Sequence, residues 1–284
     1  MKYIVLTLDT EDWYHLDYLK DTNYDKSYSM LDGVDTFLDI CAQEAVPSTL
    51  FILGELSHKL KNKSNYLNKF GHEIATHGWN HKRPMQLSIK EFVDDVKKSI
   101  SSNEQHFGSK VIGYRAPCFS IDRKRLDVLI NKTSLKYDAS RIMFKSHPLY
   151  GAIDIYGFDT IAPNIYCIND FYEFENNTSN LLGKVLPCSG GGYLRIFPIF
   201  IYNKLITQII QRAQPFFLYM HPYELSSKPC PKLPSSVSAL NKFRFQYGRK
   251  QTKAKLSKII KLFKDSGYKF VTFRTLRNIM QGCV

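Results

Sequence analysis

The sequence contains no apolar run that approaches the length of a membrane span, about 18 residues. The first residues, 1–9, are apolar only briefly and lack the longer apolar core and cleavage site of a secretory signal. Cysteine is also scarce, with six in 284 residues and no Cys-x-x-Cys pair, so we expect no disulfide framework. These absences predict a cytoplasmic protein with free thiols.

Nucleic-acid-binding patterns are missing as well. The formal net charge is +13, yet no zinc-finger, helix-turn-helix or RNA-platform pattern accompanies it. The plain interpretation of the charge is a solvated helix face, and the functional ones are an anionic membrane surface, an anionic glycan or nucleic acid, with nucleic acid ranked last. Much of the charge lies late in the chain, in Lys242, Arg244, Arg249, Lys250, Lys253, Lys255, Lys258, Lys261 and Lys264.

The composition is that of a globular protein. Hydrophobic residues make up 44% and charged residues 23% of a chain that is long enough to bury a large core. Apolar runs typical of buried strands alternate with amphipathic helical patterns, which predicts a parallel sheet with outer helices, either a barrel or a doubly wound sheet. We expect one domain over 1–284. Within it, 141–192 shows no period and is expected to form long loops, and a basic helix is expected at about 252–266.

Five potentially reactive side chains stand at or just past the ends of predicted strands. In a barrel, active-site groups collect at the carboxyl ends of the strands. The sequence therefore predicts that these five residues share one site: Asp9, His77, Arg115, Asp138 and His221.

A metal site is the first chemistry that these residues suggest. His77 and His81 are four positions apart, so one turn of chain would bring both imidazoles to one side. A divalent cation needs such a pair and a third ligand. Asp9, Glu11 and Asp12 follow the first strand and offer both a ligand and a general base. Each pattern alone also fits surface residues, and their combination favours a metal.

Two further residues complete a hydrolytic site. Arg115 at a strand end can hold a carboxylate in a bidentate contact, or else be a surface arginine before a turn. His221 ends an apolar strand and precedes a proline, and it could donate a proton to a leaving group. Metal, carboxylate base and histidine acid together predict hydrolysis at a carbonyl.

The order of these motifs resembles the polysaccharide deacetylases, the NodB-homology enzymes of carbohydrate esterase family four. The resemblance covers most of the chain and implies a distorted (β/α) barrel, with parallel strands and outer helices, that removes acetyl groups from sugars with a divalent metal. The motifs that carry it are Leu6-Thr7-Leu8-Asp9, Thr76-His77-Gly78-Trp79-Asn80-His81, Arg115-Ala116-Pro117 and Tyr219-Met220-His221.

The resemblance also implies roles. Asp9 would be the catalytic base, Arg115 would steady it, the N–H of Cys118 would help to form the oxyanion hole, and His221 would be the general acid.

The metal would be held by His77 and His81 with a carboxylate. The usual second aspartate of the first motif is replaced by Thr10, so the carboxylate is Glu11 or Asp12, with Glu11 favoured. Zinc is the default for histidine-rich ligation.

Further features are similar to a branch associated with bacterial exopolysaccharide and surface-glycan genes. Asp138 is followed by alanine, which leaves open whether it tunes the acid or holds structure. Trp79, Tyr193 and Arg195 are candidate sugar contacts, with core packing as the alternative for each aromatic ring.

These features predict a metal-dependent N-deacetylase acting on an N-acetylated sugar in surface-polysaccharide assembly. Alternatives are hydrolysis of another small amide such as a formamide, and a catalytically silent glycan-binding protein. We expect no nucleic acid partner. We expect a nucleotide-linked or lipid-linked sugar, and contact of the basic helix with an anionic membrane.

Overall fold

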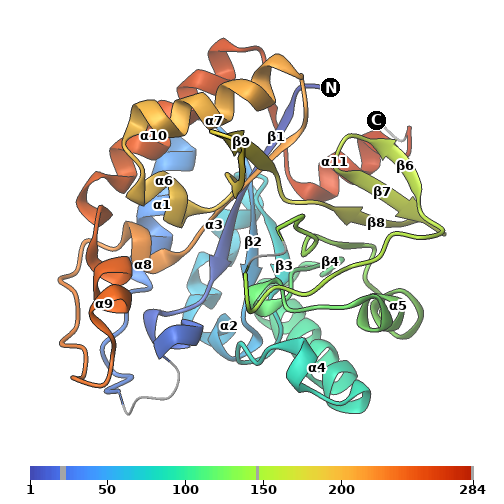
Figure 1. Cartoon of the computed structure of the whole chain (residues 1–284). Helices are drawn as coiled ribbons and strands as arrows, with labels where there is room; N and C mark the ends of the chain where they lie inside the picture. Colours follow the sequence, from blue (N-terminus) through green and yellow to red (C-terminus); the bar gives the residue numbers. More distant parts are fainter. Residues whose placement is uncertain (20–23, 145–146, 283–284) are drawn as a thin grey trace.

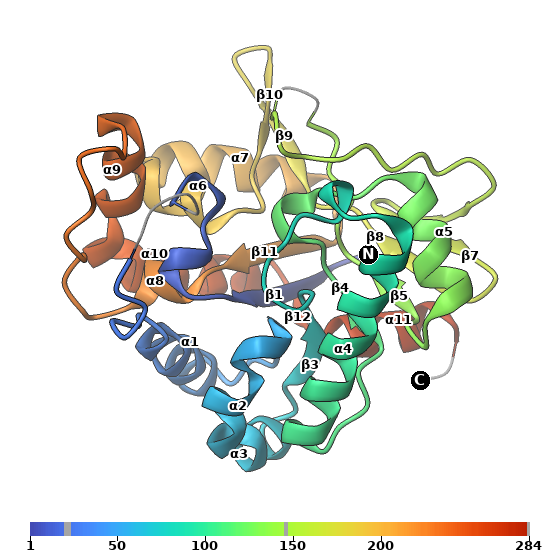
Figure 2. The same cartoon turned by 90° about the horizontal axis from the view of Figure 1, so that it is seen from below.

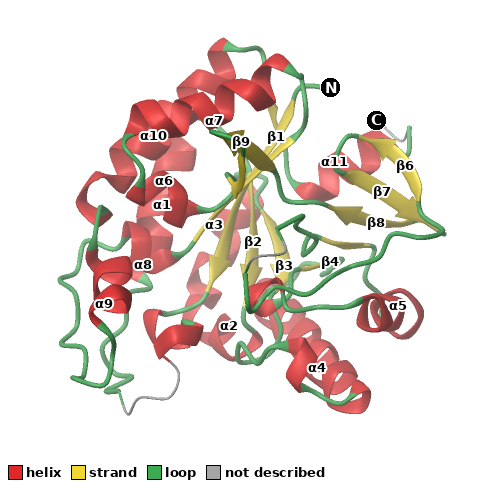
Figure 3. Ribbon diagram, in the orientation of Figure 1, coloured by secondary structure: helices red, strands yellow, loops and turns green. Residues whose placement is uncertain are grey.

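A curved sheet of parallel strands forms the centre of the molecule (Figures 1 and 3). The computed structural model describes residues 1–19, 24–144 and 147–282. Neighbouring strands follow the order β11-β1-β2-β3-β4-β5, all parallel, and β12 pairs with the start of β1. The strands are β1 (Tyr3–Thr10), β2 (Ser48–Ile52), β3 (Glu73–Thr76), β4 (Gly113–Tyr114), β5 (Tyr137–Asp138), β11 (Phe216–Met220) and β12 (Lys269–Phe270).

Apart from β12, these strands are buried on both faces. Consecutive residues of β1, such as Ile4 and Val5, point to opposite faces of the sheet and belong to two different apolar clusters. Continuous apolar sequence is what a parallel sheet covered on both faces requires. The buried parallel strands that the sequence predicted are therefore confirmed for this part of the chain.

Helices surround the strands, as the view from below shows (Figure 2). Local sequence defines several ends: Ser88 and Glu91 form a capping box at the start of α4, and Gly108 ends it in the left-handed conformation. The helices are α1 (Asp32–Gln43), α2 (Ser57–Leu60), α3 (Ser64–Lys69), α4 (Ile89–Phe107), α5 (Arg123–Lys132), α6 (Gly191–Ile196), α7 (Ile199–Gln211), α8 (Pro222–Leu225), α9 (Ala239–Gln246), α10 (Arg249–Asp265) and α11 (Phe273–Met280). Short 3-10 helices are η1 (Trp13–His15), η2 (Asp17–Leu19), η3 (Gly54–Leu56), η4 (Lys61–Lys63), η5 (Pro84–Gln86) and η6 (Pro117–Phe119).

The expectation of long loops over 141–192 is wrong from residue 159 to residue 187, a stretch that contains five strands. β8 pairs parallel to β5, and β7 and β6 continue the sheet as antiparallel strands, whereas β9 and β10 form a separate hairpin. Each is only four residues long, too short to show a period of its own. Their bounds are β6 (Asp159–Ala162), β7 (Ile165–Ile168), β8 (Phe171–Phe174), β9 (Thr178–Leu181) and β10 (Lys184–Pro187).

Between β8 and β11, the barrel is closed by side chains and irregular backbone. The buried Asn177 amide accepts from the Phe217 N–H at 3.1 Å and donates to the Pro215 carbonyl at 2.9 Å. Gly190 forms an isolated parallel bridge with Tyr219. Side-chain bonds here replace the regular strand ladder, so the barrel is distorted.

Every helix within the described residues is too short or too polar to cross a membrane. The described cysteines are free thiols, and Cys283 lies outside the described residues.

Candidate active site

Three of the five strand-end residues line one cavity of about 200 Å³, and a fourth, Arg115, lies behind it against Asp9. Asp9 comes from the end of β1, His77 follows β3, and His221 follows β11, while Arg115, directly after β4, contacts Asp9. Asp138 does not line the cavity. The remaining residues that line the cavity are Glu11, Leu16, Asp17, Tyr18, His81, Ala116, Cys118, Phe119, His147, Leu149, Tyr150, Tyr219 and Tyr223.

Glu11, His77 and His81 form a buried cluster that could hold a metal ion. One ligand atom from each lies within 4.8 Å of the others, and His81 Nε2 is 2.6 Å from Glu11 Oε2. The backbone reverses at Gly78 (φ 78°) and His81 (φ 60°), which brings the second imidazole back toward the first. His77 Nδ1 faces the Arg115 carbonyl at 2.8 Å, the kind of contact that fixes the ring of a metal-binding histidine.

The protonation of this cluster also suits a cation. Burial lowers the pKa of His77 to about 4, so the imidazole is neutral and able to bind a metal. Burial raises the pKa of Glu11, but His81, His221 and His77 together outweigh it and hold that pKa well below its ordinary value. Two imidazoles and a carboxylate are a donor set that a divalent metal accepts, so these residues fit the implied metal.

Asp12 lies in a different environment from Glu11. Its Oδ1 accepts from the main-chain N–H groups of Trp13 and Met30, both at 2.9 Å, and its own N–H donates to His15 Nδ1. Asp12 therefore caps η1 and ties the following loop to it. Of the two carboxylates that the sequence offered as a ligand, Glu11 is the one that faces the histidines.

Arg115 is fully buried and holds Asp9. One terminal guanidinium nitrogen donates to Asp9 Oδ1 at 2.7 Å and to Thr7 Oγ1 at 2.6 Å, and Nε donates to the Ala139 carbonyl at 3.1 Å. The ring of Phe51 lies against the guanidinium, with the centroid 4.2 Å away. A buried charge pair with these additional hydrogen bonds fixes the orientation of Asp9.

Glu224 is the functional residue that the sequence reasoning missed. Its Oε2 accepts from the His221 main-chain N–H at 3.0 Å and lies 3.2 Å from His221 Nδ1, and its Oε1 lies 3.4 Å from Arg195 Nε. Nε2 of His221 is 3.6 Å from Glu11 Oε1. Burial alone would lower the pKa of His221, but Glu224, Glu11 and Asp9 raise it to about 9. The spacing of His221 and Glu224 is that of a capping box, a signal visible in the sequence.

Cys118 lines the cavity on a strained turn. It has φ 53° and Phe119 has φ 52°, although neither is a glycine. Each such residue costs about 1–2 kcal/mol. The turn therefore stores strain beside the cavity, where strained backbone often has a function.

The three residues expected to contact sugar lie elsewhere. Trp79 does not line the cavity, and the Lys98 ammonium lies 3.7 Å from its ring centroid. Tyr193 packs on Phe197. Arg195 is buried, and its guanidinium donates to the carbonyls of Arg244 and Tyr247 and pairs with Glu224. Tyrosines close to His221 line the cavity instead.

Asp138 forms part of a buried carboxyl pair with Glu173. It accepts from the Ser140 hydroxyl at 2.7 Å, and that hydroxyl accepts from the Ala116 N–H at 2.8 Å. Burial is the main cause that raises the pKa of Asp138 to about 6, and burial and Asp138 together raise that of Glu173 well above its ordinary value. In this arrangement Asp138 supports the Arg115–Ala116 backbone from outside the cavity.

Two family models match successive parts of the chain. Residues 2–136 match "Polysaccharide deacetylase", and residues 140–278 match "Domain of unknown function (DUF3473)". The peptidoglycan deacetylase of Helicobacter pylori is 25% identical over 118 residues, 42% of this chain and 40% of that protein. The peptidoglycan deacetylase-like protein FGM2 of Gibberella zeae is 33% identical over 110 residues, 38% of this chain and 32% of that protein. The matched segment therefore spans less than half the length of either curated relative.

Solved structures match nearly the whole chain. A Mycobacterium smegmatis protein assigned to the polysaccharide deacetylases has a TM-score of 0.64 at 16% identity, covering 99% of this chain and 91% of that chain. Peptidoglycan deacetylase PdaC of Bacillus subtilis has a TM-score of 0.53 at 14% identity, covering 99% and 92%. A CE4 family pseudoenzyme of Bacillus anthracis has a TM-score of 0.53 at 14% identity, covering 98% and 66%. These likenesses confirm the expected fold, a distorted (β/α) barrel of the NodB-homology type.

Proposed function

Because the chain belongs to the polysaccharide deacetylase family, we propose that it is a metal-dependent hydrolase of an N-acetylated sugar. It removes the N-acetyl group during assembly of a surface polysaccharide. The observation that carries this proposal is the shared cavity of Glu11, His77 and His81 with Asp9 and His221. A candidate metal cluster, a candidate base and a candidate acid face the same small volume.

The residues divide the work as follows. A divalent metal held by Glu11, His77 and His81 would polarise the acetyl carbonyl and make a bound water more acidic. Asp9, held in place by Arg115, accepts a proton from the attacking water. The water oxygen bonds to the carbonyl carbon, and the main-chain N–H of Cys118, a residue that lines the cavity, would donate to the oxygen that becomes negative.

Collapse of the tetrahedral species breaks the C–N bond. Glu224 engages Nδ1 of His221, so Nε2 is the nitrogen on the side of Glu11 and the cavity. From there it gives a proton to the leaving amine. The products are acetate and a free amino sugar. Asp9 then releases its proton to solvent and His221 takes one up from solvent, which restores both residues to their starting states.

The substrate and location are finer parts of the same proposal. We propose zinc as the metal, since two of three ligands are imidazoles. The free thiols support a reducing, cytoplasmic compartment. There the sugar would be nucleotide-linked or lipid-linked, and the basic late part of the chain would contact an anionic membrane.

Acetate release by the purified protein tests the reaction class. Asp9→Asn and His221→Asn should lose at least about a hundredfold of the activity while keeping their metal, and Lys59→Gln, a surface change, should lose none. Release of formate from N-formyl sugars, with no acetate from N-acetyl sugars, would replace the acetyl substrate by a formamide. Metal binding without any amide hydrolysis would favour a catalytically silent glycan-binding protein; the similar Bacillus anthracis structure is that of a pseudoenzyme.

A further inference from the structure

All of the excess positive charge of the chain lies in residues 176–264. The only acidic residue of this segment is Glu224, which is buried. The rest of the chain, 1–175 and 265–284, contains 24 basic and 25 acidic residues of the 39 and 26 in total and is nearly neutral. The basic residues of the segment are Lys184, Arg195, Lys204, Arg212, Lys228, Lys232, Lys242, Arg244, Arg249, Lys250, Lys253, Lys255, Lys258, Lys261 and Lys264.

Helix α10 cannot itself enter a membrane. Leu256, Ile259 and Phe263 are fully buried in the core and Leu262 is half-buried, so the large side chains that the helix exposes are mainly lysines. Lys250, Lys253 and Lys258 are exposed. The expectation that the basic helix rests on a membrane therefore needs an apolar contribution from another element.

Helix α9 supplies that contribution. Leu240 and Phe243 lie on one face of the helix, Tyr247 follows directly after its end, and the three are 57%, 49% and 49% exposed. The rings of Phe243 and Tyr247 stack at 4.7 Å. On the opposite face, Phe245 is fully buried and stacks on Tyr223 at 5.2 Å. The helix is thus anchored by one aromatic residue while its apolar stripe faces solvent.

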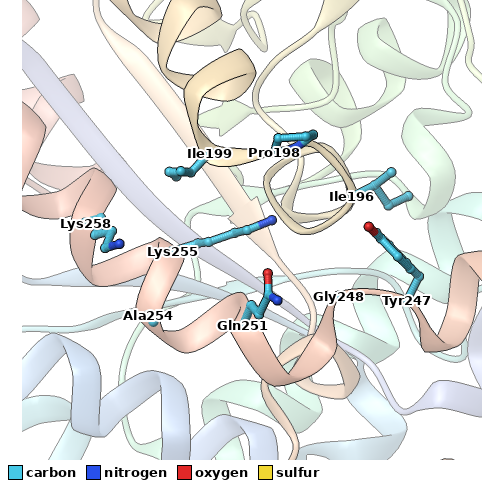
Figure 4. A pocket seen from close by; sticks show the side chains of 9 residues that line it. All are labelled: Ile196, Pro198, Ile199, Tyr247, Gly248, Gln251, Ala254, Lys255 and Lys258. Carbon is cyan, nitrogen blue, oxygen red and sulfur yellow. The ribbon is translucent and has the colours of Figure 1, made fainter.

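The stripe continues into a groove of about 470 Å³ between α10 and the connection of α6 to α7 (Figure 4). Ile196, Pro198 and Ile199 face Tyr247 across it, and Lys258 lies at its far end. Phe200, next along the chain, is 64% exposed. Exposed apolar side chains and the groove therefore adjoin the lysine-bearing face of α10. Lys258 lines the groove itself, whereas Lys250 and Lys253 line a neighbouring hollow beside Lys228.

We propose that this surface, made by α9, the groove and the exposed lysines of α10, docks on an anionic lipid bilayer. Leu240, Phe243 and Tyr247 enter the interface between headgroups and acyl chains, and the lysines contact the lipid phosphates. Charge complementarity with large apolar side chains favours a bilayer over nucleic acid, whose binding surfaces pair positive charge with phosphates and bases. The inference deepens the membrane contact proposed above and does not depend on the hydrolytic chemistry.

Sedimentation with vesicles tests the proposal on the full chain. At low salt we expect binding to phosphatidylcholine vesicles that contain about one third phosphatidylglycerol, at least about tenfold tighter than to phosphatidylcholine alone, and weaker with added salt. The double variant Lys258→Gln/Lys261→Gln removes the exposed lysine that lines the groove and the exposed lysine one turn further on. It should bind at least about tenfold more weakly, since each lysine contributes about fivefold. The matched control Lys59→Gln/Lys61→Gln changes two exposed lysines on α2 and η4 and should bind normally.

The apolar part has its own test. Phe243→Ser/Tyr247→Ser should weaken binding severalfold with thermal unfolding unchanged, whereas Tyr156→Ser, an 84% exposed aromatic elsewhere, should not. Absence of binding to the anionic vesicles would overturn the proposal. Binding that depends on the lysines but not on Phe243 and Tyr247 would also overturn it, by showing a purely electrostatic contact. Sedimentation needs no turnover, so a lack of vesicle binding would leave the deacetylase proposal standing. In the same way, a lack of acetate release would leave the membrane proposal standing.

Discussion

Replacing Glu224 with Gln tests whether this carboxylate controls His221. Glu224 contacts both the main-chain N–H and Nδ1 of His221, at 3.0 and 3.2 Å. Burial on its own would lower the pKa of His221, and the carboxylates, Glu224 first among them, raise it to about 9. Gln keeps the shape of the side chain but removes the charge, so the pKa of His221 should fall toward its ordinary value of about 6.5.

The expected loss of activity therefore grows with pH. At pH 8 a histidine with a pKa of about 9 is about 90% protonated, and one with a pKa of about 6.5 is about 3% protonated. Acetate release by Glu224→Gln should fall about 30-fold at pH 8 and less than about twofold at pH 6. Arg195 loses its charged partner but keeps the carbonyls of Arg244 and Tyr247, so we expect about 2–3 kcal/mol of lost stability.

The control is Glu73→Gln, which removes a buried carboxylate outside the cavity. It should lower stability without changing the pH profile of activity. An equal loss at pH 6 and pH 8 for Glu224→Gln would refute the assignment of Glu224 to His221, as would an unchanged profile.

Two further changes separate other claims. His81→Ala should abolish metal binding, whereas Asp12→Asn should leave it intact because Asp12 accepts hydrogen bonds from main-chain N–H groups. The metal content of both proteins, measured by mass spectrometry, checks this. Equal loss of metal in the two variants would contradict the ligand set. Burial lowers the pKa of His72 to about 4. Between about pH 6.5 and 4, this histidine therefore binds a proton in the unfolded chain before it does so in the folded protein. The free energy of unfolding should fall by about 2–3 kcal/mol as the pH falls through this range. Urea unfolding of His72→Gln should lack this part of the pH dependence, and a difference from the parent that is constant with pH would contradict it.

The sequence predicted the positions of catalytic candidates better than their partners. Asp9, His77 and His221 could be placed in one site because parallel strands end at one edge of a barrel, which is a property of topology. The pairing of Arg115 with Asp9 was expected from the resemblance to the polysaccharide deacetylases, and the structure brings the two together at 2.7 Å. Glu224 was missed although its spacing from His221 is that of a capping box, because this motif is normally formed on serine, threonine or aspartate rather than on a candidate acid.

Side-chain direction was the second limit. Glu11 and Asp12 are neighbours, and only the capping of η1 by Asp12 decides which one faces the histidines. Trp79 stands inside the histidine motif, but its ring packs beside Lys98. Arg195 stood out as a charged residue after three glycines, and folding buries it against Glu224.

The strands of 141–192 were missed although their turns carried a signal. Asn169 and Asp170 both have positive φ between β7 and β8, and Leu182 and Gly183 do so between β9 and β10. Two-residue turns of this kind connect hairpin strands, and Asn-Asp is a composition that allows them. The strands themselves are four residues long, too short for alternation to show.

The most direct test of the central claim is acetate release from N-acetylglucosamine oligomers by the purified protein, with its metal content measured before chelation, after chelation and after a divalent metal is restored. We predict release that disappears with the metal and returns with it. Release that continues unchanged in fully metal-free protein would contradict the account.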